Sequence, residues 1–288
     1  MTISSSSSTV GIVGSGIMGS GIAEVAAKAG HDVVLRSRKQ DTADAMRAGL
    51  EKSLGKQVEK GRLSEEERDV TLARVTTTDQ IADLADCDLV IESVVEDLAV
   101  KRALFAELDE VVAPGAILAT NTSTLPVVEM AVATGRPESV VGVHFFNPAP
   151  MMALVEIVAP LTASEETVEA VTEFATGCGK SPVRVADRAG FIVNALLFPY
   201  LNNAVRMLEN GTASRDDIDE AMKGGCNFPM GPLALLDLVG LDTSVAILDA
   251  LHAEFADPNF SPAPVLRRMV AAGHLGRKSG QGFHDYRR

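Results

Sequence analysis

The chain has 288 residues, which exceeds the usual size of one domain, and its 46% hydrophobic and 23% charged residues are typical of a folded globular protein. A net charge of −13 argues against a nucleic-acid partner, and no apolar stretch is long enough to predict a membrane span. The three widely spaced cysteines form no metal or redox motif, and a serine run at residues 4–8 lacks the apolar segment of a secretory signal, so we expect a cytoplasmic protein without a metal site.

A glycine-rich turn is predicted near the N-terminus, where residues 14–19 read GSGIMG after an apolar run at residues 10–13. A stretch of small residues follows, so the order predicts a strand, a tight turn and a helix. In this arrangement Gly14 forms the turn, Gly16 lets the backbone approach a pyrophosphate, and Gly19 packs the helix on the strand. The pattern predicts a dinucleotide site at the helix N-terminus; the alternative is a glycine-rich turn of another α/β protein. The predicted contacts are Gly14, Gly16, Ile17, Met18 and Gly19.

Apolar, β-branched runs then alternate with helical patterns, which predicts a mostly parallel, doubly wound α/β sheet of Rossmann type. The runs lie at residues 10–13, 33–35, 89–91, 117–118, 140–143, 154–158 and 183–185. Residues 41–74 are an insertion in which Gly61 separates two helical segments, and the stretch from Ser64 to Glu67 is a capping box for the second. This insertion predicts a helical hairpin inside a first domain at residues 1–188.

Strand patterns end after Ala186, and helical patterns follow at residues 191–208, 214–222 and 233–255. We therefore expect a second, all-helical domain at residues 189–288. Residues 229–236, PMGPLALL, are apolar on nearly every face, more than a small helical domain can bury against itself. They predict core plus a subunit interface, and hence a homodimer; the alternative is that the whole surface packs against the first domain.

Polar residues at the carboxyl ends of the predicted strands are the candidates for chemistry, because ligands of doubly wound sheets bind there. They are Glu92, the segment Asn121-Thr122-Ser123, His144 and Glu156. Glu156 lies among branched apolar residues, where an uncompensated carboxylate is costly to desolvate. The turn-rich link at residues 147–150 can bring His144 beside it, and the carboxylate then fixes the tautomer of a general base. The alternative is a satisfied core histidine and an edge-strand charge.

Taken together, these motifs resemble the NAD(P)-dependent 3-hydroxyacyl-CoA dehydrogenases, most closely the short single-function 3-hydroxybutyryl-CoA dehydrogenases. The resemblance covers nearly the whole chain. It rests on residues 14–19, Asn121-Thr122-Ser123, the segment HFFNPAP at residues 144–150 with Glu156 after it, GFIVN at 190–194, PMGP at 229–232 and LGRKSG at 275–280.

The resemblance implies hydride transfer between nicotinamide and C3 of a CoA thioester, such as (S)-3-hydroxybutyryl-CoA. It makes His144 the general base for the 3-hydroxyl and Glu156 the residue that orients it. Ser123 and Asn194 would hydrogen-bond the reacting oxygen or the thioester, although Asn194 as a purely structural helix residue stays an alternative. The family's second domain is helical and mediates dimerisation. Further predicted cofactor contacts are Glu96, Lys101 and Asn121.

The end of the second strand bears on the choice of cofactor. Members of the resembling family that bind NAD usually have an aspartate where Ser37 lies, which accepts hydrogen bonds from the adenine ribose. Serine between Arg36 and Arg38 offers donors and positive charge to a 2′-phosphate. The sequence therefore predicts NADP in preference to NAD; the alternative is that both arginines are merely solvated.

A basic stripe on the first helix of the insertion bears on coenzyme A, whose phosphorylated end is strongly anionic. Lys52, Lys56 and Lys60 recur at four-residue spacing, with Ser53 beside them. The family's hairpin contacts the coenzyme, so Ser53, Lys56 and Lys60 are candidate substrate contacts. A solvated helix face balanced by nearby glutamates explains the same spacing.

Other functions on the same fold stay open at this point. One is oxidation of a longer or dicarboxylic 3-hydroxyacyl-CoA, or of an acid without CoA. The other is a non-catalytic dinucleotide-binding protein, since a fold does not prove an activity. The complete set of Ser123, His144, Glu156 and Asn194 favours an enzyme.

Overall fold

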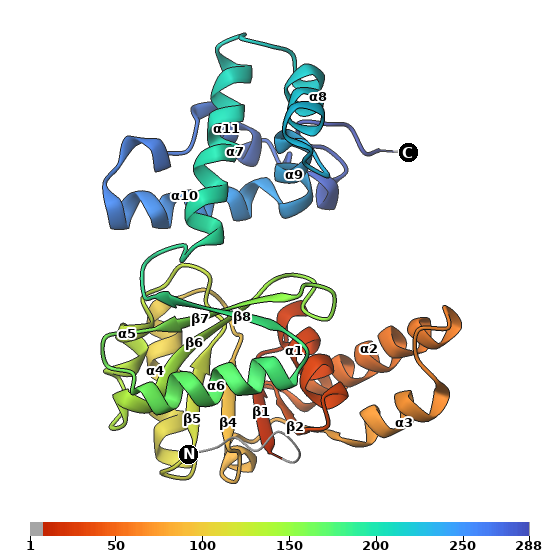
Figure 1. The fold of residues 1–288 in the computed structure, drawn as a ribbon, viewed down its shortest axis with the longest axis vertical. Helices are drawn as coiled ribbons and strands as arrows, with labels where there is room; N and C mark the ends of the chain where they lie inside the picture. The colour runs from red at the N-terminus through yellow and green to blue at the C-terminus, as the bar shows by residue number, and fades with distance from the viewer. Residues whose placement is uncertain (1–7, 288) are drawn as a thin grey trace. The chain divides into compact units, whose positions relative to one another are not determined.

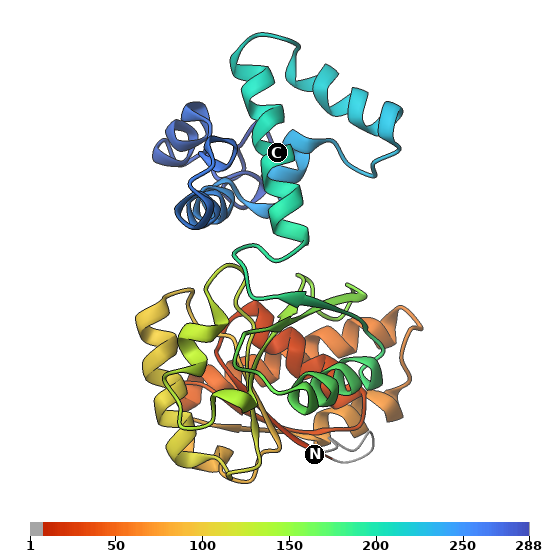
Figure 2. The same cartoon turned by 60° about the vertical axis from the view of Figure 1, so that its left-hand side comes forward.

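The computed structural model describes residues 8–287, so the predicted serine run lies outside the described residues except for Ser8. The chain forms two compact units that divide between Asp187 and Arg188. Each unit has its own apolar core. Figures 1 and 2 colour the first unit red to green and the second blue-green to blue.

Within the described residues, the first unit is built on an eight-stranded sheet in which every neighbouring pair is parallel except β6–β7. In sheet order the strands are β3 (Val75–Thr78), β2 (Asp32–Arg36), β1 (Thr9–Val13), β4 (Leu89–Glu92), β5 (Ile117–Thr120), β6 (Val140–Phe145), β7 (Leu154–Ala159) and β8 (Ser181–Ala186). The predicted doubly wound fold is confirmed. Only β3 lacks a predicted counterpart, because three of its four residues are threonine and no apolar run marks it.

Helices cover both faces of this sheet (Figures 1 and 2). They are α1 (Ile17–Lys28), α2 (Gln40–Glu59), α3 (Glu65–Ala73), α4 (Leu98–Val111), α5 (Val127–Ala131) and α6 (Glu165–Gly177). Helices α1, α2 and α6 share one core cluster with alternate strand residues such as Val141 and Val143. Gly142 faces the opposite side, where a Cβ would meet Val127 of α5. This alternation is expected for a sheet buried on both faces.

The inserted helical hairpin is formed by α2 and α3, which extend beyond the sheet (Figure 1). Gly61 in the link has φ +65°, a left-handed conformation that glycine adopts without strain. Ser64 accepts a hydrogen bond from the amide of Glu67, whose carboxylate accepts one from the amide of Ser64. The predicted hairpin and its capping box are therefore present.

The second unit is helical. Its helices are α7 (Val193–Glu209), α8 (Arg215–Cys226), α9 (Pro232–Val239), α10 (Leu241–Phe255) and α11 (Pro264–Ala271). The predicted single helix at residues 233–255 is wrong, because Gly240 has φ +105° and separates α9 from α10. Helix α7 begins two residues later than predicted, after Phe191 at φ +49°. None of the helices in residues 8–287 is both long enough and apolar enough to cross a membrane.

Candidate active site

The turn between β1 and α1 has the geometry that its glycines permit. Gly14 has φ +134°, and a Cβ there would overlap the carbonyl oxygen of Ser93, so only glycine fits. A Cβ at Gly19 would overlap the carbonyl oxygen of Gly14, which explains the close packing of α1 on the turn. Apart from Gly16 and its two chain neighbours, no heavy atom of the described residues lies within 4 Å of a Cβ built on Gly16, so space lies in front of its backbone. The first turn of α1 carries no acidic residue, so its amides are open to an anion.

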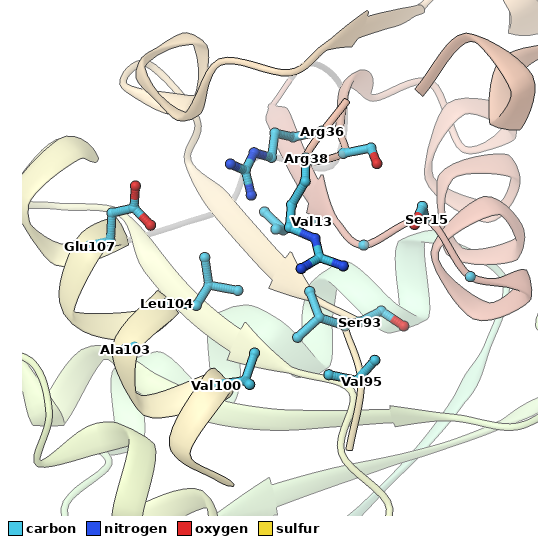
Figure 3. Close-up of a pocket in the computed structure, with 14 residues that line it drawn as sticks. Val13, Ser15, Arg36, Arg38, Ser93, Val95, Val100, Ala103, Leu104 and Glu107 are labelled. Atoms are coloured by element: carbon cyan, nitrogen blue, oxygen red, sulfur yellow. The ribbon is translucent and has the colours of Figure 1, made fainter. Parts of the chain in front are cut away.

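A cavity of about 720 Å³ adjoins this turn (Figure 3). Arg36 and Arg38 project toward it from the end of β2. The opposite wall comes from α4, with Val100, Leu104 and Glu107. An apolar wall facing cationic groups, next to a helix N-terminus, suits a flat base and a phosphorylated ribose.

At the end of β2, a hydrogen bond holds the backbone of Ser37, and the side chain of Arg36 has a donor atom without a partner. The amide of Ser37 donates to the carbonyl of Thr78 in β3 at 3.0 Å, and the residue is 5% exposed. The Nε of Arg36 is buried and has no hydrogen-bond partner within residues 8–287. A buried donor without a partner is unfavourable, and the Arg36 side chain that carries it lines the cavity.

His144 and Glu156 form a buried hydrogen-bonded pair across the antiparallel strands β6 and β7. Their backbones are register partners, and His144 Nδ1 lies 2.7 Å from Glu156 Oε2. The residues are 4% and 0% exposed. The ring of Phe146 lies against the imidazole, with centroids 4.6 Å apart. The expected adjacency of the two residues is therefore present.

Ser123 lies on the other side of the imidazole, with its Oγ 3.1 Å from His144 Nε2. A carboxylate only accepts, so Nδ1 donates to Glu156, and Nε2 is the acceptor for the Ser123 hydroxyl. The backbone of Ser123 is also fixed, because its amide donates to Glu96 Oε1 at 2.8 Å. The three side chains form a line that can accept and return one proton.

Asn121 connects this group to the cavity beside the β1–α1 turn. Its Oδ1 accepts from the amide of Phe145 at 2.8 Å, next to His144 in β6. Its Nδ2 donates to Oγ of Ser93, which lines the cavity, at 3.4 Å. Asn121 therefore ties the end of β6 to the cavity wall.

Comparison with known proteins agrees with this site. The family model of the 3-hydroxyacyl-CoA dehydrogenase NAD-binding domain matches residues 9–188, and that of the C-terminal domain matches residues 190–286. The chain belongs to the 3-hydroxyacyl-CoA dehydrogenase family. The resemblance read from its motifs is confirmed, and the first unit of this dehydrogenase holds a nicotinamide-dinucleotide-binding domain.

Several relatives match this dehydrogenase over nearly its whole length. A 3-hydroxybutyryl-CoA dehydrogenase of Mycobacterium tuberculosis is 51% identical over 279 residues, with 96% of this chain and 98% of that protein covered. One of Clostridioides difficile is 47% identical over 275 residues, with 96% and 98% covered. The crystal structure of (S)-3-hydroxybutyryl-CoA dehydrogenase PaaH1 from Ralstonia eutropha has a TM-score of 0.94 at 42% identity, with 97% and 99% covered.

Lys101 and Glu96, both predicted cofactor contacts of the dehydrogenase, belong to a partly buried charge cluster. Lys101 is 1% exposed, and its Nζ lies 2.6 Å from Glu92 Oε1 and 3.3 Å from Glu96 Oε2. The sequence marked Glu92 only as a polar residue at a strand end. Its pairing with Lys101 was missed, although a carboxylate ending a buried strand and a lysine inside the next helix were the available signal.

The predicted substrate contacts lie on α2. Ser53 lines a second cavity of about 460 Å³ together with Gly16 and Ile17, and its Oγ donates to Glu24 Oε2 at 3.0 Å. Lys56 and Lys60 are exposed. The predicted contacts therefore have different surroundings. Ser53 is half-buried and bonded to a carboxylate, whereas Lys56 and Lys60 face the solvent.

The remaining predicted residues have different surroundings. Ile17 is 78% exposed, whereas Met18 packs against the core cluster of the first unit. Asn194 belongs to the second unit, where it lies in the first turn of α7 and is 8% exposed. Ser123, His144 and Glu156 are the part of the predicted catalytic set that the first unit holds together.

Proposed function

We propose that this dehydrogenase interconverts (S)-3-hydroxybutyryl-CoA, or another short-chain 3-hydroxyacyl-CoA, and the corresponding 3-ketoacyl-CoA with a nicotinamide dinucleotide. The observation that carries the proposal is the line from Ser123 through His144 to Glu156, in the same unit as the dinucleotide cavity. Relatives named 3-hydroxybutyryl-CoA dehydrogenase at 43–51% identity support the short acyl chain.

The roles of the residues follow from their bonds. When bound, oxidised nicotinamide supplies the hydride acceptor for C3 of the substrate. His144 Nε2 takes the proton of the 3-hydroxyl, and Glu156 stabilises the imidazolium that results. Ser123 Oγ, within hydrogen-bond distance of the same nitrogen, holds the substrate oxygen in line with it. In the opposite direction the imidazolium returns the proton to the new alcohol.

The test is the loss of reduced-cofactor absorbance on addition of acetoacetyl-CoA. His144→Ala is expected to lower kcat by about 10³-fold, since it removes the group that donates the proton in this direction. His252→Ala is the matched control, because this exposed histidine of α10 should leave kcat unchanged. A series of longer and dicarboxylic 3-ketoacyl-CoA substrates measures the preferred chain length. Full turnover by the His144→Ala variant would overturn the proposal.

Within this proposal the favoured cofactor is NADP. The buried Nε of Arg36, the charge of Arg38 and the uncharged Ser37 support it, because a 2′-phosphate needs donors and no opposing carboxylate. The wild-type enzyme is expected to have the higher kcat/KM with NADPH than with NADH. Ser37→Asp should reverse this preference and lower the ratio of kcat/KM with NADPH to kcat/KM with NADH by about tenfold or more. The reason is that repulsion between the new carboxylate and the 2′-phosphate costs more than about 1.4 kcal/mol. A clear NADH preference of the wild type would refute the assignment.

The proposed CoA contacts are Ser53, Lys56 and Lys60. Two exposed cations at one-turn spacing on α2 support this, because the protein as a whole repels phosphate. Replacing both lysines with alanine should raise KM for acetoacetyl-CoA by roughly fivefold at low salt. A pantetheine thioester, which lacks the phosphorylated end, should show no such rise. Equal effects on both substrates would exclude the lysines.

The helical unit is the proposed substrate-binding and dimerisation domain, and Asn194 the proposed contact to substrate. Leu233 and Leu236 of α9 are fully buried, whereas Leu238 is 50% exposed, as an interface residue would be in an isolated protomer. Light scattering should give a dimer for the wild type and a monomer for Leu238→Glu. The cytoplasmic setting is part of the same proposal and is supported by cysteines that are all free thiols.

A further inference from the structure

We infer that Glu92 is a positioning residue for the proposed reaction, which joins the wall of the dinucleotide cavity to the loop that carries Ser123. The inference rests on the proposed function and adds to it a residue that contacts neither substrate nor cofactor. It concerns the end of β4, in the middle of the sheet.

Glu92 is fully buried, and its two oxygens accept hydrogen bonds from three separate segments. Oε1 accepts from the amide of Val94 at 2.6 Å and from Nζ of Lys101 at 2.6 Å. Oε2 accepts from Oγ1 of Thr120 at 2.7 Å. One carboxylate therefore fixes the loop after β4, the first turns of α4 and the end of β5.

The first two of these segments form the cavity wall. Val94 lines the cavity together with its neighbours Ser93 and Val95 (Figure 3). Lys101 directly follows Val100, whose side chain faces the same space from α4. Because both segments bond the same oxygen of Glu92, a shift of that carboxylate would move both sides of the wall.

The other bonds lead to Ser123. Oγ1 of Thr120 accepts from the amide of Thr122 at 3.2 Å, which fixes the start of the loop after β5. Lys101 also lies 3.3 Å from Glu96 Oε2, and Oε1 of Glu96 accepts from the amide of Ser123 at 2.8 Å. Two routes thus run from Glu92 to the residue that faces His144, and a hydrogen bond from Thr122 Oγ1 to Glu96 Oε1 at 2.6 Å joins them.

The energetics favour a positioning role over a purely stabilising one. A buried carboxylate and ammonium are expensive to desolvate, and apolar side chains of similar volume would stabilise a core equally well or better. The ion pair instead fixes the orientation of the side chains. Lys101 lies between two carboxylates and orients Glu96 toward the backbone of Ser123.

The test compares Glu92→Gln, the double variant Glu92→Gln/Lys101→Met, and Asp109→Asn as a matched control. The double variant leaves no unpaired buried charge, so it keeps the test open if the single variant folds poorly. Asp109 is also on α4 and forms an ion pair of 2.6 Å, but with Arg136, outside the network. Kinetics use acetoacetyl-CoA, and binding uses the fluorescence of NADPH.

Both Glu92 variants are expected to lower kcat by about 10- to 100-fold while KM for acetoacetyl-CoA stays within about threefold. Glu92→Gln should also raise the Kd of NADPH by roughly fivefold; the Kd of the double variant is not used, because that variant also removes Lys101, a predicted cofactor contact. Because Glu92 acts through Ser123, the same substitutions in a Ser123→Ala background should lower kcat by less than about threefold. Asp109→Asn should lower thermal stability and leave kcat and Kd unchanged.

Two outcomes would overturn the inference. One is a folded Glu92 variant with wild-type kcat, or a folded Glu92→Gln protein with wild-type Kd, either of which would make the cluster merely structural. The other is a loss of kcat that is fully additive with Ser123→Ala. Failure of the wild type to reduce acetoacetyl-CoA would instead overturn the proposed function, and the Kd measurement would then still decide whether Glu92 fixes the cavity wall.

Discussion

The two units of this dehydrogenase each contain a histidine bonded to a buried carboxylate. In the first unit His144 Nδ1 lies 2.7 Å from Glu156 Oε2, and in the second His284 Nε2 lies 2.8 Å from Asp219 Oδ2. The carboxylate-bearing residues are 0% and 6% exposed. The distance and the burial of the carboxylate are therefore similar in the two pairs, although the imidazole of His144 is more deeply buried than that of His284, with the side chains 5% and 23% exposed.

The surroundings of the two pairs differ. Asp219 also accepts hydrogen bonds from the amides of Leu233 and Ala234 at the start of α9, so its carboxylate caps a helix. His144 instead has Ser123 within hydrogen-bond distance of its second ring nitrogen. The comparison teaches that a second polar group on the far side of the imidazole distinguishes the proposed catalytic pair from the structural one.

The largest expected effect tests this difference directly. Glu156→Gln should lower kcat by about 10³-fold, because the amide neither stabilises the imidazolium nor selects the tautomer as a carboxylate does. Asp219→Asn should leave kcat per folded molecule unchanged and lower the unfolding temperature. Steady-state kinetics and thermal unfolding of both variants measure the two effects. Similar kcat losses in both variants would remove the distinction.

The second unit gives the next largest effect, on stability. Asp237 is 1% exposed and accepts from the amides of Phe283 and His284 and from the hydroxyl of Tyr286. Asp237→Ala should lower the free energy of unfolding by about 3 kcal/mol, because several donors lose a buried acceptor. Urea unfolding of the full chain measures the loss.

Asp285→Ala is the control for that measurement. This exposed aspartate of the same segment bonds to Arg287, which lowers its pKa to about 2, and water replaces that contact readily. The free energy of unfolding should therefore stay at the wild-type value. If Asp237→Ala also left it unchanged, the buried carboxylates of the second unit would have no structural role.

Much of the geometry of the proposed catalytic site could be predicted from the sequence, because the residues concerned follow regular backbone patterns. Glu156 was conspicuous as a carboxylate in an apolar strand, and a short turn before it predicted its approach to His144. Glycine spacing likewise predicted the turn at Gly14, where no side chain fits. In both cases local pattern and tertiary structure agree.

The parts that could not be predicted depend on contacts between distant segments. The pairing of Glu92 with Lys101 depends on how α4 lies on the sheet, which periodicity does not specify. The break at Gly240 has a similar origin, because helical propensity alone tolerates a glycine there. Gly240 has φ +105°, and a Cβ there would lie 3.2 Å from Nζ of Lys278, a distant residue whose position no local pattern encodes.

A third histidine, His31, extends the comparison and gives the smallest expected effect. His31 is 2% exposed, and its Nδ1 bonds a hydroxyl, Ser8 Oγ at 2.8 Å, rather than a carboxylate. Burial lowers the pKa of His31 below its usual 6.5, an effect to which the nearby charge of Arg74 adds. In the unfolded chain the ring binds a proton more readily, so stability is fully present above pH 6.5 and is lost as the pH falls below it.

Replacing His31 with glutamine should therefore flatten the pH dependence of stability. Between pH 7.5 and 5.5 the unfolding temperature of the wild type should fall by roughly 2–3 °C more than that of His31→Gln. His274→Gln is the comparison variant and should follow the wild type over this range. Parallel curves for wild type and His31→Gln would show that a hydroxyl partner lets His31 take up a proton in the folded protein, as a carboxylate would.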